Sequence, residues 1–385
     1  MKWILLVPGA LVPEALAPDL ANTAHAARLS ELLVGARLVA DYRAAEPSVG
    51  APHWSWLALH FGVQSDLPVT APYAWQALGG SLTEAQRGWI GFCDPVHMAV
   101  GRDRVILTDL EDAPLQAEET EVLLSLASDA LRVASFDVAL QRTADEASYS
   151  GLRIQVQGGR WFLLADTSVD LQSVSLDAVL GHSVHEHMPE GADARHWRNL
   201  ANEIQMLWHT SAVNAAREQR GVQLANALWV HGGGQWTPLP ASSITELQVQ
   251  EQFLDIAVLQ GWLLASAGGN PDRNSSTRSR SFGSGDTLSV CRALFRPFAY
   301  QDWESWLQRL PLLEERLERE LAAARNRGAS ESELLLCGTQ QVRTLALPLH
   351  TPWWRWSRSA SRASAQALQR WLGEQDISMA RTSRT

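Results

Sequence analysis

The sequence WILLVPG at positions 3–9 decides the fold. Five consecutive apolar residues are typical of a short strand that is buried on both faces, and a Pro-Gly pair ends such a strand in a turn. A helical pattern follows around residues 24–38. Because a buried strand followed by a helix is how a parallel sheet begins, we expect an α/β protein with a central, mostly parallel sheet.

The same opening residues also have features of a secretory signal peptide, since Lys2 precedes the apolar run and the small residues Ala15 and Ala17 flank Leu16, as at a cleavage site. Pro8-Gly9 interrupts the apolar run, however, and a single lysine provides little of the positive charge that usually precedes the apolar run of a signal peptide. We therefore prefer a buried first strand and a cytoplasmic protein, with a cleaved signal as the alternative. No stretch reaches the roughly 18 apolar residues of a membrane span.

Composition narrows the possible functions. The chain has 385 residues and a formal net charge of −10, which argues against binding to duplex nucleic acid. Lys2 is the only lysine, so Schiff-base catalysis, a P-loop lysine and a kinase strand lysine lack their residue. No G-x-S-x-G motif for a serine nucleophile occurs. Cys93, Cys291 and Cys337 form no C-x-x-C pair, so we expect neither a disulfide framework nor a cysteine zinc site.

Between about residues 88 and 175 the sequence pattern changes and predicts β-hairpins. Strands are expected at 94–100 and 104–107, and again at 152–157 and 161–165, with a helix at 118–133 between the two hairpins. This pattern predicts a compact α+β domain at residues 88–192, inserted into a discontinuous α/β core domain at residues 1–87 and 193–350.

The second part of the core domain is expected to alternate helices and strands. The predicted elements are a helix from residue 193, a second parallel strand at 227–231, a helix at 246–266, a long loop at 268–286, a charged helix at 302–327, and closing strands at 334–337 and 342–347. An Arg/Trp/Ser-rich segment, 351–385, ends the chain. Such a segment docks on acidic protein, lipid headgroups or single-stranded nucleic acid, or packs back through its tryptophans.

Polar residues around the predicted strand at 227–231 form a candidate anion site. Asn214 and Arg217 lie one helical turn apart, and Arg217 could clamp a phosphate or carboxylate. Exposed amides of a glycine triplet can form an anion nest, although a flexible turn is the default interpretation. The candidate ligand-binding residues are Asn202, Asn214, Arg217, Asn226, Gly232, Gly233 and Gly234.

Histidines gather between residues 182 and 209, with carboxylates among them. Such clusters can hold zinc or manganese, but the spacing is loose and solvated histidines explain it equally well. The turn Asp94-Pro95-Val96-His97 could aim two more ligands into a cleft. The candidate metal ligands are Asp94, His97, His182, His185 and His187.

The run from Asn202 through Arg217, then Gly221, Asn226 and Gly232-Gly233-Gly234, resembles the bacterial family called regulator of pathogenicity factors E. The turn at residues 94–97 and the opening strand resemble that family too. It is in turn similar to archaeal-type cofactor-independent phosphoglycerate mutases. The resemblance implies an alkaline-phosphatase-like core with an inserted domain.

Those mutases use two metals, an Asp-Gly after the first strand, a serine or threonine nucleophile, and later Asp-His ligand pairs. Here Pro8-Gly9 stands in place of Asp-Gly, and no Asp-His dipeptide occurs. The resemblance therefore implies a catalytically degenerate protein that binds a small anionic ligand and has a regulatory or interaction role. The rival hypothesis is a metal-dependent phosphohydrolase or mutase that uses the candidate Asp/His ligands instead.

Overall fold

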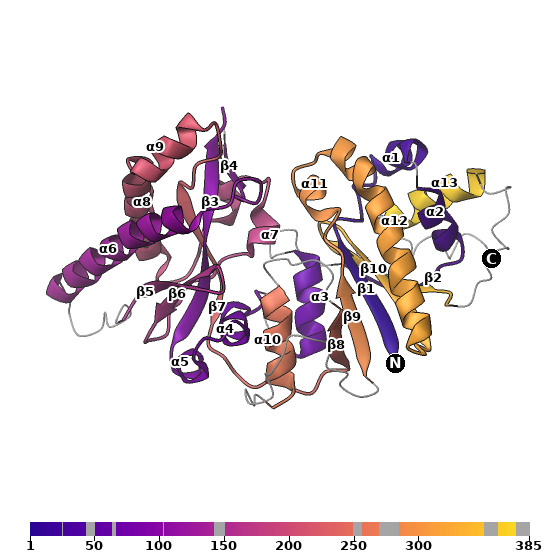
Figure 1. Cartoon of the computed structure of the whole chain (residues 1–385), viewed down its shortest axis with the longest axis horizontal. Coiled ribbons are helices and arrows are strands. Elements are labelled where there is room, and N and C mark those ends of the chain that lie inside the picture. Colours follow the sequence, from indigo (N-terminus) through magenta and orange to yellow (C-terminus); the bar gives the residue numbers. More distant parts are fainter. Residues whose placement is uncertain are drawn as a thin grey trace.

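The computed structural model describes residues 1–24, 26–43, 51–63, 67–102, 104–141, 151–248, 256–268, 285–349 and 361–374. Two β-sheets lie side by side, each with its own helices (Figure 1). We call them the parallel-sheet unit (β1, β2 and β8–β11) and the antiparallel-sheet unit (β3–β7). Among the described residues, no helix is long and apolar enough to cross a membrane.

The parallel-sheet unit is built on the opening strand of the chain. Its six strands have the order β2-β11-β10-β1-β9-β8. β1 lies in the middle and pairs in parallel with β10 and β9, and β8 extends the parallel part. The strand bounds are β1 Lys2–Pro8, β2 Arg37–Arg43, β8 Ile244–Gln248, β9 Asp286–Val290, β10 Glu331–Cys337 and β11 Gln341–Leu347. The expected α/β fold with a mostly parallel central sheet is confirmed.

Helices cover both faces of this sheet, which is why β1 is apolar from Trp3 to Val7. Trp3, Leu5 and Val7 pack in one cluster with α1, α2, α12 and α13, whereas Ile4 and Leu6 pack in another with α3 and α10. The bounds of the helices are α1 Ala17–Thr23, α2 Ala27–Val34, α3 Pro52–Phe61, α10 Ile256–Ser266, α11 Phe295–Ala299, α12 Trp303–Asn326 and α13 Ser361–Leu372.

The antiparallel-sheet unit contains the two predicted hairpins, with strand order β4-β3-β6-β5. β7 pairs with β3 on its other side. The strand bounds are β3 Trp89–Val100, β4 Val105–Thr108, β5 Arg153–Gln157, β6 Arg160–Ala165 and β7 Ala227–Gly234. α6 (Ala117–Gln141) and α8 (Ala194–His209) pack on one face of this sheet, next to α9 (Ala212–Gln219).

The prediction of a parallel strand at 227–231 is wrong in direction, because β7 runs antiparallel to β3. An apolar strand followed by glycines carries no mark of direction or of partner sheet. The pairing of β7 with β3 also extends the antiparallel sheet to Gly234, whereas the sequence placed the end of the inserted domain at residue 192.

Several other elements differ from expectation. The region 246–266, expected to be one helix, contributes β8 and then α10, and the end of the helix expected at 24–38 is the edge strand β2. The loop expected at 268–286 and the tryptophans at 353–356 lie almost wholly outside the described residues. The remaining helices are α4 Ala71–Ala77, α5 Leu82–Arg87, α7 Leu176–Val179 and a 3₁₀ turn at Val184–His187.

The two units share part of their hydrophobic core. One cluster joins Phe92 and Phe162 of the antiparallel sheet to Leu6 and Leu288 of the parallel sheet, with α3, α4 and α10 between them. A second cluster joins Val96 and Trp229 to Phe295 of α11. The units are therefore packed against each other rather than linked by chain alone.

Candidate functional site

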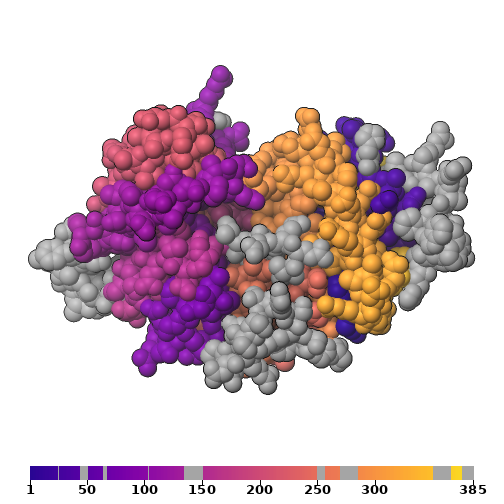
Figure 2. Space-filling view, viewed as in Figure 1, coloured from indigo at the N-terminus to yellow at the C-terminus, as the bar shows by residue number. Residues whose placement is uncertain are grey.

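A cavity of about 870 Å³ lies between the two units and is lined by residues of both. We call it the interunit cavity. Figure 2 shows the antiparallel-sheet unit and the parallel-sheet unit meeting along a seam in the middle of the molecule. The walls contain aromatic and aliphatic side chains, among them Trp54, Phe92, Leu176 and Phe295. A mostly apolar cavity with a few polar side chains is the usual form of a small-molecule site.

The antiparallel sheet places three charged or titratable side chains in one wall of this cavity. Successive side chains of a strand alternate between the two faces, so Cys93, Leu163 and Val230 enter the core beneath α6 and α8. Their neighbours in sequence take the opposite face. The residues of that face that line the cavity are Phe92, Asp94, Arg160 and His231.

Asp94 is the centre of a buried polar cluster. Arg160 donates to both of its carboxylate oxygens, from Nε at 3.2 Å and from Nη2 at 2.9 Å. His231 Nε2 lies 3.0 Å from Oδ2. Burial alone would raise the pKa of Asp94, but the Arg160 charge and the His231 hydrogen bond lower it below its usual range. Asp94 is therefore a carboxylate, and the guanidinium of Arg160 also lies 4.2 Å from the Phe92 ring centroid.

A second buried carboxylate, Asp177, joins the two units. Arg292 forms a two-pronged ion pair with it, both N–O distances being 2.8 Å. His53 Nε2 lies 3.1 Å from Asp177 Oδ2, and the indole of Trp54 donates to the same oxygen. Burial would raise the pKa of Asp177, but Arg292 and His53 hold it well below its usual range.

Two more arginines reach the cavity from the parallel-sheet unit. Arg296 pairs with Asp109 at 2.9 Å and with Asp112 at 2.8 Å. Arg309 donates to the Ala293 carbonyl at 3.3 Å, and among the described residues it makes no ion pair. The cavity lining thus holds four arginines and five carboxylates, and three of the arginines are paired with Asp94, Asp177 or Asp109. Glu111 and Glu121 lie at the exposed edge.

Two buried polar atoms in the cavity lining have no hydrogen-bond partner in the described structure. They are Nδ1 of His231 and Oγ of Ser175. Buried polar groups are almost always satisfied, because leaving one unpaired costs about 1–3 kcal/mol. Both atoms belong to residues of the cavity lining, where a bound ligand could supply the missing partner.

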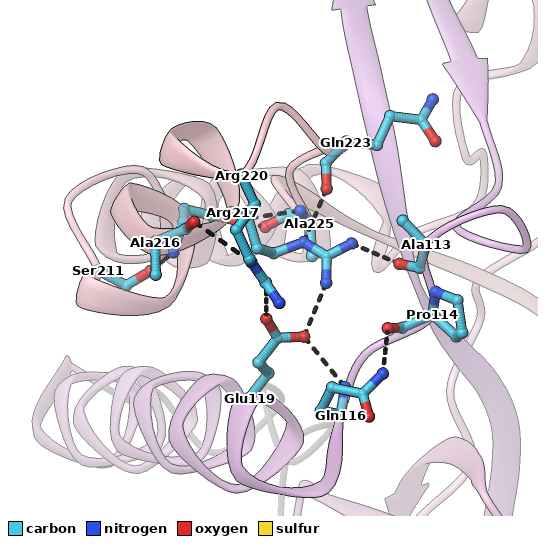
Figure 3. A network of polar contacts seen from close by, with 11 residues as sticks. Ala113, Pro114, Gln116, Glu119, Ser211, Ala216, Arg217, Arg220, Gln223 and Ala225 are labelled. Carbon is cyan, nitrogen blue, oxygen red and sulfur yellow. Dashed lines mark hydrogen bonds and ion pairs between the residues drawn. The ribbon is translucent and has the colours of Figure 1, made fainter.

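The structure places the sequence-predicted anion residues elsewhere. Arg217 is buried, and its guanidinium donates to the Gln223 carbonyl at 2.7 Å, to the Ala113 carbonyl and to Glu119 at 2.7 Å (Figure 3). It therefore clamps the start of α6 and the loop before it. That loop contributes Pro114 and Leu115 to the cavity, so Arg217 supports the site from behind.

The three predicted asparagines do not line the cavity. Asn214 donates to the Trp208 and Ala225 carbonyls and accepts from the Ala225 amide, which joins α9 to the segment before β7. Asn226 exchanges hydrogen bonds with the backbone of Met98 on β3. Asn202 is exposed on α8. Two of the three side chains therefore join backbone segments.

The glycine triplet is explained mainly by close packing. A Cβ on Gly233 would meet the Trp89 indole at 2.0 Å, and one on Gly234 would meet Val69 at 2.7 Å. Gly232 lines the cavity and has φ of 61°, a conformation that favours glycine. Its carbonyl accepts from the Thr70 amide at 3.0 Å. Of the predicted set, only Gly232 reaches the cavity.

The candidate metal ligands do not come together. Asp94 is held by Arg160 and His231, whereas His97 Nδ1 lies 2.9 Å from the Leu224 carbonyl. His182 Nδ1 lies 2.8 Å from the Leu180 carbonyl. The His182 and His187 rings are 6.4 Å apart, and His185 is exposed. In the described part of the chain, no group of three His, Cys, Asp or Glu side chains could hold a metal ion.

The sequence interpretation missed Arg160, Asp177, His231 and Arg292. A signal was present for two of them, because Arg160 opens the apolar run WFLLA and His231 ends the apolar run ALWV. A charged or titratable residue beside a buried strand needs a partner, which marks it as a residue to examine. The pairing of these residues across two units depends on the fold and carries no local signal.

No protein-family model and no curated protein matches the chain. Solved structures similar to it over most of its length include two from archaea. The PH0037 protein of Pyrococcus horikoshii has 10% identity and a TM-score of 0.46, covering 90% of this chain and 87% of its own. The cofactor-independent phosphoglycerate mutase of Thermoplasma acidophilum has 14% identity and a TM-score of 0.34, covering 95% and 94%. This likeness is too distant to carry a ligand or an activity over, and membership of the regulator of pathogenicity factors E family stays a prediction.

Proposed function

We propose that this protein binds a small organic anion in the interunit cavity and acts through that binding, in a regulatory role, rather than by two-metal phosphoryl transfer. The proposal keeps the anionic ligand expected from the sequence. It moves the site from Arg217, Asn214 and Asn226, whose donors are used within the fold, to the cavity between the units.

The observation that carries the proposal is the gathering of four arginines around one cavity. Arg160, Arg292 and Arg296 are each paired with a carboxylate, whereas Arg309 forms no ion pair with the described residues, so its guanidinium is the one that can pair with an anionic ligand. A guanidinium binds carboxylate and phosphate groups with directed hydrogen bonds. The aromatic and aliphatic walls suit a ligand with an apolar body, such as an aromatic acid or an aryl phosphate.

The proposal also rests on two features of the sequence. Pro8-Gly9 follows the first strand where the mutases that the chain resembles have Asp-Gly, and the chain contains no Asp-His dipeptide. In those enzymes, the Asp-Gly after the first strand and the Asp-His pairs belong to the two-metal site. Their replacement supports binding without the standard reaction.

Calorimetric titration with benzoate and phenyl phosphate as probes tests the proposal. Wild-type protein is expected to bind at least one of them saturably. Arg309→Met should weaken that binding by about tenfold or more, as expected for the loss of a charged hydrogen bond. The control is Arg132→Met, an exposed arginine of α6 paired with Asp129, which should not change the affinity. No saturable binding of either probe, or equal affinity in Arg309→Met, would contradict the proposal.

Metal analysis separates this proposal from the rival metal-dependent phosphohydrolase. The rival requires stoichiometric zinc or manganese in the purified protein, and His97→Ala and His185→Ala should each remove it. Binding of the organic probes after extensive dialysis against a chelator, with unchanged affinity, supports the metal-independent site.

A further inference from the structure

The inference concerns His231 and rests on the proposed function, because it specifies the ligand of the same cavity. The ring lies in the wall formed by β7 and is 5% exposed. Its Nε2 lies 3.0 Å from Asp94 Oδ2. A carboxylate only accepts hydrogen bonds, so the hydrogen of this bond must be on Nε2. In the neutral ring, Nδ1 then carries a lone pair and is an acceptor.

The surroundings of His231 hold the ring in this orientation. Asp94 is itself fixed by two hydrogen bonds from Arg160. The Phe92 ring, directly across from His231 in the β3–β7 register, has its centroid 5.1 Å from the imidazole centroid. A carboxylate that fixes the tautomer and an aromatic ring that fixes the plane leave one direction for the unpartnered Nδ1.

Ser175 supplies a second unpartnered atom in the same lining. The carbonyl of the preceding residue, Val174, accepts from the Trp229 indole at 3.1 Å. Trp229 and His231 are two positions apart on β7 and therefore share a face of the sheet. Ser175 thus follows a residue that is fixed to the face carrying His231, although its Oγ makes no hydrogen bond to the imidazole.

We propose that the ligand of the interunit cavity is a hydroxylated organic acid whose hydroxyl group is recognised by His231 and Ser175. A bare carboxylate or phosphate offers only acceptors and leaves the Nδ1 lone pair unsatisfied. An ammonium group can donate to Nδ1 but cannot accept from the Ser175 hydroxyl. A hydroxyl group does both, while the acid group of the same molecule is held on the arginine side of the cavity.

Matched ligands test this assignment. The affinities of 2-, 3- and 4-hydroxybenzoate are measured by calorimetry against that of benzoate, because they differ only in the hydroxyl and its position. At least one isomer should bind wild-type protein about fivefold or more tightly than benzoate, the gain expected for one buried hydrogen bond. In His231→Phe, which keeps a ring but has no acceptor, the ratio of the two affinities should fall to about one.

The control variant is His97→Phe, on the neighbouring strand β3 and outside the cavity lining, which should keep the wild-type ratio. If benzoate binds but no isomer binds more tightly, or if the ratio survives in His231→Phe, the hydroxyl assignment is wrong while the anion site stands. If none of the four acids binds, the proposed aromatic-acid site itself is wrong.

A measurement without ligand or variant addresses the same point. In wild-type protein labelled with [¹⁵N]histidine, the neutral form of the His231 ring should show a protonated Nε2 and an unprotonated Nδ1. A protonated Nδ1 in the ligand-free protein would overturn the inference, since that atom would then be a donor and would favour a bare anion instead.

Discussion

Arg217 and Arg220 both contact Glu119, yet only one of them is buried. The Arg217 side chain is 1% exposed and also donates to two backbone carbonyls, whereas Arg220 is 52% exposed. Partial burial would raise the pKa of Glu119, but the Gln116 amide and these two arginines lower it below its usual range. The buried Arg217–Glu119 ion pair should therefore contribute more to the stability of the fold than the exposed Arg220–Glu119 ion pair.

Arg217→Ala should destabilise the protein by about 3 kcal/mol or more, because it leaves a carboxylate and two carbonyls without their buried donor. Arg220→Ala, which breaks an exposed ion pair with the same carboxylate, should cost less than about 1 kcal/mol. Urea unfolding of both variants measures the two costs. Equal costs would show that Arg217 does not have the anchoring role seen in the contacts.

Asp177 gives the protein a predictable response to acid. Its pKa in the folded state lies well below the usual range, so its ion pair stabilises the fold above the pKa of an unfolded aspartate, about 3.9. That contribution is lost as the pH falls below this value. Asp177→Asn should be less stable than wild type by about 3 kcal/mol at pH 7.

The difference between wild type and Asp177→Asn should shrink as the pH is lowered from 5 to 3, and urea unfolding at three pH values across this range measures it. A difference that stays constant over the range would show that the pKa of Asp177 is not lowered in the fold. Asp302→Asn is a comparison for the size of the effect at pH 7, because that carboxylate is exposed and caps α12, where asparagine caps about as well, so this substitution should cost much less than Asp177→Asn.

Single residues also show the limit of sequence prediction for the site. The spacing of Asn214 and Arg217 correctly indicates that they share one side of α9, and both are buried. Whether their donors face a ligand or a backbone carbonyl depends on Ala113 and Ala225, which the fold brings close. His231 and Asp94 are 137 positions apart, so no local pattern could have paired them.

At the scale of elements, local patterns predicted best where an element's own periodicity decides it. Both hairpins, the helix at 118–133 and the closing strands β10 and β11 are confirmed. The predictions failed where the structure of an element depends on which strand it pairs with. β7 has the apolar run of a buried strand in either direction, and only its contacts with β3 make it antiparallel.

α13 forms part of the core although it belongs to the Arg/Trp/Ser-rich segment. Trp371 is buried, and its indole donates to the Leu33 carbonyl at 2.8 Å. Arg343 of β11 donates to the Trp371 and Gly373 carbonyls at 2.8 and 2.9 Å. Leu368 and Leu372 pack in the same cluster as α1 and α2. This part of the segment packs back through its tryptophan, one of the two expectations from the sequence.

Trp371→Ala should therefore destabilise the protein by about 3–5 kcal/mol, the usual cost of truncating a buried tryptophan. Gln366→Ala, at an exposed position of the same helix, should change the stability by less than about 0.5 kcal/mol. Thermal and urea unfolding compare the two. A Trp371→Ala protein as stable as wild type would mean that α13 is a docking segment rather than a structural element.

At the scale of the whole molecule, the shared core couples the two sheets in ligand binding and in unfolding. Clusters containing residues of both sheets surround the interunit cavity. Its sides are closed by cross-unit contacts such as the Arg292–Asp177 ion pair and the hydrogen bond that the Asp109 amide donates to the Tyr300 hydroxyl. A cavity between units that share a core is preformed, so a ligand meets its walls already assembled. The same packing makes the two units depend on each other for stability.

The cysteines report on this dependence, since Cys93 lies in the antiparallel sheet and Cys337 in the parallel sheet. Both are buried, and burial raises the pKa of both thiols, so neither should react with a thiol reagent at pH 8 in the folded protein. Because the core is continuous across the sheets, both should become reactive at the same urea concentration. Pulsed labelling followed by peptide mass spectrometry measures each site separately. Labelling of Cys93 at a lower urea concentration than Cys337 would show that the antiparallel-sheet unit unfolds first and that the shared clusters do not couple the two units.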